Sequence, residues 1–132
     1  MKSNQLNTSE QPPTASASSP RDNPCLGNDP TITALDVFAD NGISYLLPYA
    51  QFLYAERISN PALEKEPDAP PEKMRICFAT AEVVVLGSGL KRLEHGIQKS
   101  ELKFVKSADR RLAATLSTHV AAVTLTLTKE NV

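Results

Sequence analysis

Residues 74–86 restrict the fold more than any other part of the sequence, because they read as two adjacent β-strands. From Met74 to Phe78, large apolar residues occupy alternate positions, which is the period of a strand with one buried face. The β-branched run 83–86 follows and is typical of a central strand. Since the segment 80–82 between them is short enough for a hairpin, the sequence predicts a sheet that is at least partly antiparallel.

Three further segments carry a strand pattern. Residues 101–106 and 123–127 alternate apolar with polar side chains, and threonines on one side of 123–127 suit an antiparallel sheet with a solvated face. The apolar run Gln51–Ile58 follows Pro48, where proline favours a break. We interpret 51–58 as a strand, although a helix through the same residues is the main alternative, because short apolar runs are ambiguous by periodicity.

Helical spacing occurs after the predicted hairpin. Leu90, Leu93 and Ile97 lie on one face of an amphipathic helix, and Ser88 is its expected N-terminal cap. A second short helix is predicted over 31–42, where Asn41-Gly42 would supply the left-handed stop. Residues 107–118 fit a helix or a strand, and their alanine content favours the helix.

These elements predict an α+β fold: a small, mostly antiparallel sheet of about four strands, with one or two packed helices. Residues 1–30 are mainly Ser, Thr, Asn, Gln, Pro and Ala, and such a segment lacks the apolar surface needed to offset the entropy of ordering. We therefore expect a disordered tail at 1–30 and one small domain at 31–132. Within that domain, the Pro-rich segment 59–73 is expected to be a flexible surface loop.

The only basic feature of a chain with net charge −1 runs from Lys91 to Arg111, with seven bases against three acids. Directly before it, 87–89 reads Gly-Ser-Gly between the predicted strand and helix. The stretch 83–93 resembles the start of a dinucleotide-binding fingerprint, although Arg92 stands at the third glycine position. Backbone amides at this turn and the bases beside it are candidates to contact an anion or a partner. The candidate residues are Gly87, Ser88, Gly89, Lys91, Arg92, Lys103, Lys106, Arg110 and Arg111.

No catalytic, cofactor or metal-ligand motif is predicted. His95, His119, Cys25 and Cys77 have no spacing typical of a metal site. We read Cys77 as a small buried hydrophobe. A nucleophilic pair of Cys77 with one histidine is an alternative, since such partners need only be close in space. We therefore do not expect an enzyme.

The leading functional hypothesis is a non-enzymatic protein-interaction or regulatory module. Its partner would be a second copy or another protein that pairs with an open sheet edge, for which the last strand is the candidate. The alternative is an anion or nucleic-acid binder that uses the basic segment 87–111, where Phe104 is the single aromatic residue and is expected in the core. No apolar stretch has the length of a membrane span or a secretory signal, so we expect a cytoplasmic location and no membrane partner.

Overall fold

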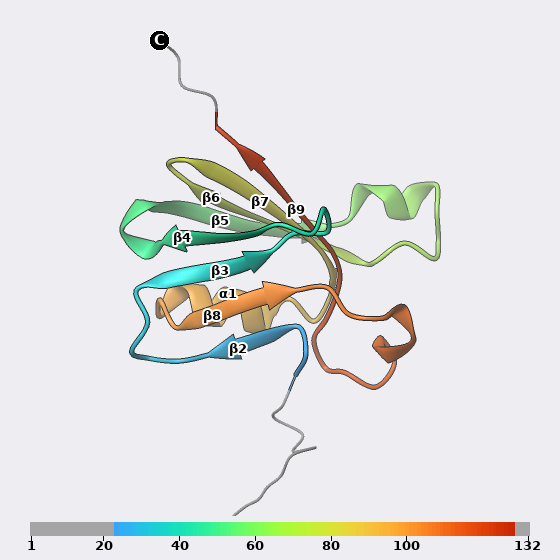
Figure 1. The fold of residues 1–132 in the computed structure, drawn as a ribbon. Helices are drawn as coiled ribbons and strands as arrows, with labels where there is room; N and C mark the ends of the chain where they lie inside the picture. The colour runs from blue at the N-terminus through green and yellow to red at the C-terminus, as the bar shows by residue number, and fades with distance from the viewer. Residues whose placement is uncertain (1–22, 129–132) are drawn as a thin grey trace, which may run out of the picture.

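The computed structural model describes residues 23–128, and within them the chain forms two four-stranded β-sheets (Figure 1). Sheet I has the order β2 (Leu26–Asn28), β8 (Leu102–Lys106), β3 (Ala34–Phe38), β4 (Ser44–Pro48). Sheet II has the order β5 (Phe52–Ser59), β6 (Glu72–Phe78), β7 (Ala81–Ser88), β9 (His119–Leu127). Paired strands are antiparallel except β3 and β8, which are parallel.

One α-helix and three 3₁₀ turns complete the described chain. The helix α1 (Lys91–Gln98) lies behind β8 in Figure 1, and the turns are η2 (Tyr49–Gln51), η3 (Pro61–Glu64) and η4 (Arg110–Leu112). A single apolar cluster joins sheet I, sheet II and α1. In β7, for example, Val83 and Val85 are fully buried whereas Val84 and Leu86 are half-buried on the other face. This alternation shows that sheet II buries one face and leaves the other towards solvent.

The predicted α+β fold class is wrong: residues 23–128 are mostly β, with eight strands in two sheets and one α-helix. The main error lies at 31–42, where we expected a helix and the structure has β3. Leu35 and Val37 are fully buried while Asp36 between them is half-buried, which is the period of a strand. Strand β3 has partners on both sides, β4 and β8, and this pairing outweighs the weak helical spacing of the segment.

Asn41-Gly42 turns a hairpin and does not end a helix. Gly42 has a φ of 90°, and the Asn41 side chain accepts a hydrogen bond from the Ile43 amide at 2.9 Å. The Ala39 amide donates to the Ile43 carbonyl and closes the loop between β3 and β4. The pair is a frequent signal for a tight hairpin as well as for a helix stop, and here the hairpin is formed.

The folded part of the chain begins before residue 30, where we expected the tail to end. Cys25 is 0% exposed and Leu26 belongs to β2, which pairs with β8. The Cys25 thiol accepts a hydrogen bond from the Val120 amide at 3.3 Å. Residues from Cys25 onward therefore contribute to the fold, and residues 1–22 of the predicted tail lie outside the described part of the chain.

The other predicted elements have mixed outcomes. Strands over 51–58, 74–86, 101–106 and 123–127 are confirmed, and so is the amphipathic helix after the hairpin. Ser88 does not cap that helix: α1 begins after Leu90, and no N-cap side chain accepts a hydrogen bond. The helix favoured over 107–118 is wrong, because only η4 forms there. No helix between residues 23 and 128 has the length and hydropathy to cross a membrane.

Candidate functional site

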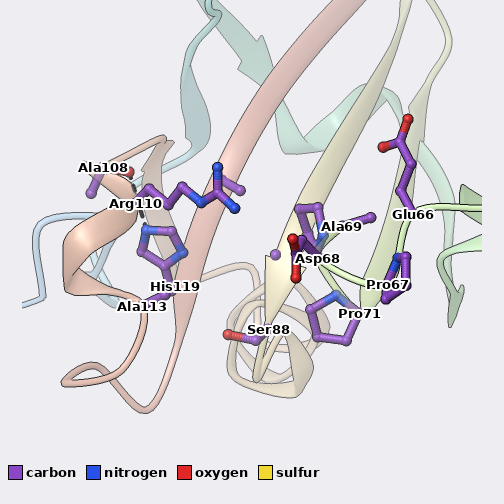
Figure 2. A pocket seen from close by; sticks show the side chains of 13 residues that line it. Glu66, Pro67, Asp68, Ala69, Pro71, Ser88, Ala108, Arg110, Ala113 and His119 are labelled. Carbon is purple, nitrogen blue, oxygen red and sulfur yellow. Dashed lines mark hydrogen bonds between the residues drawn. The ribbon is translucent and has the colours of Figure 1, made fainter. Parts of the chain in front are cut away.

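A pocket of about 720 Å³ opens where the β5–β6 loop faces the segment between β8 and β9 (Figure 2). One wall is residues 66–71 of the loop, and the opposite wall contains Ala108, Arg110 and Ala113. Gly87 and Ser88 at the end of β7, with His119 and Ala121 of β9, lie between the two walls. This volume is within the range of small-molecule sites in proteins.

The loop wall is held in place by Asn60, which is 6% exposed at the base of the loop. Its side chain donates to the Pro70 carbonyl at 2.8 Å and accepts from the Ala62 amide at 3.1 Å. Its backbone amide donates to the Pro71 carbonyl at 3.0 Å. Asn60 thus ties together the two ends of the Pro-rich segment and positions 66–71 beside the pocket.

Gly87 and Gly89 allow β9 to pass close to the end of β7. A Cβ atom on Gly87 would overlap the His119 carbonyl, and one on Gly89 would overlap the Ser117 carbonyl. Gly89 also has a φ of 63°, a conformation that glycine adopts without strain. The two glycines therefore bring the His119 backbone against β7 and place its side chain at the pocket.

The imidazole of His119 is buried, with 3% of the residue exposed. Its Nε2 lies 3.1 Å from the Ala108 carbonyl and 3.1 Å from the Asp109 carbonyl. Because carbonyl oxygens only accept hydrogen bonds, Nε2 carries a hydrogen. Between residues 23 and 128 no hydrogen bond is made to Nδ1, and Figure 2 shows this side of the ring facing the pocket.

Charges of opposite sign lie on the two walls. Arg110 extends from one wall, and Asp68 and Glu66 lie on the other (Figure 2). None of the three forms an ion pair with a residue of the described chain. Neighbouring Arg111 differs, because it pairs with Asp109 at 3.2 Å. The Arg111 backbone amide, followed by its guanidinium, lowers the pKa of the Asp109 carboxyl.

The structure separates the candidate residues predicted from the sequence. Only Gly87, Ser88 and Arg110 meet at the pocket. The others lie elsewhere: Gly89 at the β7–α1 turn, Lys91 and Arg92 on α1, Lys103 and Lys106 on β8, and Arg111 on η4. The Leu90 amide at the start of α1 donates to the Glu72 carboxylate at 2.9 Å. This amide, which we expected to meet an external anion, thus bonds a carboxylate of β6.

Phe104 was expected in the core, but it lies half-buried in sheet I beside a second phenylalanine. Its ring meets that of Phe38 edge-to-face at 6.2 Å, and Phe38 is 39% exposed. The Lys106 ammonium lies 5.7 Å from the Phe38 ring centroid. Asp36 pairs with Phe104 in the β3–β8 register, so a carboxylate lies beside these two aromatic residues.

Sequence reasoning did not select His119, Asp68 or Glu66 as site residues. His119 follows a segment with no regular pattern, and both acids lie in a Pro-rich segment that composition predicts to be disordered. They meet only because β9 pairs with β7 and because Asn60 fixes the loop. The one available signal was Gly87-Ser88-Gly89, which marks the close approach of another backbone.

The remaining chemical candidates do not assemble. No group of three or more His, Cys, Asp or Glu side chains within 23–128 is arranged to hold a metal ion. Cys77 is buried, with 8% exposed, and its thiol lies 3.9 Å from Arg75. In the described chain, neither histidine hydrogen-bonds Cys77.

Two edge strands of sheet II differ in how much of their backbone is already used. Near the start of β9, the Val120 carbonyl accepts a hydrogen bond from the Ala108 amide. The Val123 carbonyl accepts from the Asp40 amide, and the Val123 amide donates to the Asp40 carboxylate. Strand β5 is bonded to β6 on one side, and no further strand pairs with it in the described chain. The long open edge of sheet II is therefore β5.

Residues 23–128 thus form a β protein of two sheets, with a pocket beside sheet II and an open edge at β5. Comparisons with protein-family models, curated proteins and solved structures find no match to this chain.

Proposed function

We propose that this protein is a non-enzymatic interaction module that associates with a second copy of itself along β5. The observation that carries the proposal is the open backbone of this strand. The Asn60 amide bonds the Pro71 carbonyl, and bonded residues alternate along an antiparallel strand. The N–H and C=O groups of Ala55, Arg57 and Ser59 therefore point away from β6, towards the free edge.

Exposed apolar side chains accompany this free edge. Leu53 is 62% exposed, Tyr54 49% and Ile58 45%, and all three belong to β5. A long, apolar edge strand with unused backbone groups is the usual template for pairing with another strand. The competing edges are shorter or partly occupied: β2 has three residues, β4 has five and ends at Pro48, and β9 is bonded by Ala108 at Val120 and by Asp40 at Val123.

A second copy fits this edge in an antiparallel register centred on Glu56. That register sets Ala55 opposite Arg57 of the second copy, so their outward backbone groups bond in both directions. On the outer face it sets Tyr54 opposite Ile58 of the second copy, twice by symmetry. The two Glu56 side chains meet at the centre, where each is already paired with its own Arg75 at 2.8 Å.

Sedimentation equilibrium over a micromolar to millimolar concentration series tests the proposal. The wild-type chain should dimerise, and Ile58→Lys should weaken the dimer at least about tenfold, because it removes both apolar Ile58–Tyr54 contacts and places a charged side chain on each edge strand. Leu127→Lys is the matched control: Leu127 is 59% exposed at the end of β9, and its substitution should leave the dimer unchanged. A wild-type chain that remains monomeric throughout the series would contradict the proposal.

Nucleic-acid binding is the second candidate, and the Phe38–Phe104 pair with Lys106 above it is the observation that favours it. Exposed aromatic rings stack on bases, and cations bind phosphates. It ranks second because the rings are edge-to-face and Asp36 lies beside them. Binding of single-stranded RNA should weaken with rising salt and should be lost in Phe38→Ala. Affinity that does not depend on salt would exclude this function.

A further inference from the structure

We infer that the pocket between the β5–β6 loop and η4 binds a small zwitterion of short-peptide size, with a free ammonium and a free carboxylate. Its ligand would be distinct from the strand that we propose at β5, because no residue of β5 lines the pocket. Three independent features of the pocket carry this inference: its buried histidine, its opposed charges and its walls.

The buried histidine indicates a ligand with a polar group. His119 is 3% exposed, and its Nε2 hydrogen is already used by two carbonyls. The other ring nitrogen, Nδ1, has no hydrogen-bond partner within residues 23–128 and faces the pocket (Figure 2). A buried polar atom without a partner is costly, and a polar group of a ligand in the pocket would provide that partner.

The charges on the walls indicate where the two ends of the ligand lie. Arg110 and Asp68 extend towards one another across the opening in Figure 2, and no ion pair joins them. A carboxylate fits Arg110, whose guanidinium can donate two parallel hydrogen bonds. An ammonium fits Asp68 on the facing wall. A ligand with one charge would leave the opposite wall without a counterpart.

Apart from Glu66 and Ser88, the remaining lining is apolar and suits the body of a short peptide. Pro67, Pro70 and Pro71 line one side, Ala108 and Ala113 line the other, and Ala121 lies between them. The volume of about 720 Å³ is at the upper part of the small-molecule range. A pocket of this size accommodates several linked residues, whereas a single small amino acid would fill little of it.

Trialanine is the probe for the first experiment, with N-acetyl-trialanine and trialanine amide as analogues that each lack one charge. Titration of the ¹⁵N-labelled full-length chain, followed by NMR, should give saturable shifts at the Ser88 and Ala113 amides and at the His119 ring nitrogens. Trialanine should bind at least about tenfold more tightly than either analogue, since each analogue removes one charge-assisted hydrogen bond. No saturable shift at millimolar trialanine, or equal affinity for all three probes, would overturn the inference.

Matched variants then assign each end of the ligand. Arg110→Gln should weaken trialanine about tenfold and abolish its advantage over trialanine amide, which lacks the carboxylate. Arg111→Gln is the control, because Arg111 is adjacent on η4 and pairs with Asp109 outside the pocket lining. Asp68→Asn should abolish the advantage over N-acetyl-trialanine, with Glu64→Gln on η3 as its control. Control variants that change affinity as much as the pocket variants would show a general charge effect and would also overturn the inference.

Discussion

Gly87 illustrates how a single residue controls the position of the pocket. The Gly-Ser-Gly motif suggests a phosphate-binding turn. In the structure, however, its first glycine lacks the Cβ that would clash with the backbone of β9. A β-bulge between Leu86 and Gly87 accompanies this approach, and bulges locally bend a strand and change the direction of its side chains. The residue therefore acts on the pocket through the position of His119.

Gly87→Ala should destabilise the protein by about 2 kcal/mol, because the new Cβ overlaps the His119 carbonyl and β9 must shift. Urea denaturation measures the loss, and NMR shifts of the His119 ring should report the displaced strand. Gly42→Ala is the control: its Cβ meets no atom within 4 Å, so only its φ of 90° costs energy, about 1 kcal/mol. A Gly87→Ala protein as stable as wild type would show that β9 is not held close to β7.

At the level of the element, α1 obtains its N-terminal cap from a strand of sheet II. Its own N-cap residue, Leu90, has no side-chain acceptor. The Glu72 carboxylate of β6 accepts from the Leu90 amide instead, at 2.9 Å. A carboxylate at a helix N-terminus also interacts favourably with the helix dipole. The helix is therefore fastened to sheet II at its first turn.

Glu72→Ala should cost about 1 kcal/mol, the usual effect of removing a helix cap. The loss should be concentrated in α1, and hydrogen exchange at the Leu93 and Glu94 amides should accelerate more than exchange in β7. Glu72→Gln keeps an acceptor oxygen and should recover about half of the stability. Equal acceleration throughout the chain would argue against a local cap.

For the whole molecule, Tyr49 links the connection between the two sheets to sheet I. It lies on η2, where the chain passes from β4 to β5, and its hydroxyl donates to the Leu102 carbonyl on β8 at 2.7 Å. Burial raises the pKa of the Tyr49 phenol above its ordinary value of 10.0. The folded state therefore retains the phenolic proton at a pH at which the unfolded chain loses it.

This shift predicts a loss of stability at alkaline pH. Below about pH 10 the phenol is protonated in both states, and the stabilisation is fully present. Above that pH the unfolded state ionises first, so the free energy of unfolding should fall. Tyr49→Phe should cost about 1 kcal/mol at neutral pH, and urea denaturation near pH 11 should show a smaller difference from wild type. A difference that does not change with pH would contradict this role.

The sequence predicted the elements whose local pattern agrees with their final environment. Residues 74–86 alternate because one face of β6 and β7 is buried, and Leu90, Leu93 and Ile97 are spaced for α1 because that helix packs on one side. Prediction failed at β3, where Leu35 and Phe38 are also compatible with a helix. It failed again at Cys25, because the polar residues before it conceal a short strand that is stable only beside β8.

The candidate site was predictable only in part. Gly87, Ser88 and Arg110 were selected from the sequence, and they do line the pocket. Lys91, Arg92, Lys103 and Lys106 were grouped with them because they are close along the chain. The fold instead distributes these bases over α1 and β8. Grouping these bases by their proximity in the sequence therefore predicted a larger basic surface than the structure has.

The sequence by itself determined where most strands and the helix form, because alternation and helical spacing are local consequences of which side chains are buried. Only the tertiary structure decided that the strands make two sheets, that β5 keeps an open edge, and that Arg110 and Asp68 lie on opposite walls of a pocket that His119 also lines. These features depend on pairings between distant segments, such as Gly87 with Val120. Such pairings are selected by the burial and backbone hydrogen bonding of the whole chain, and no short stretch of residues contains that information.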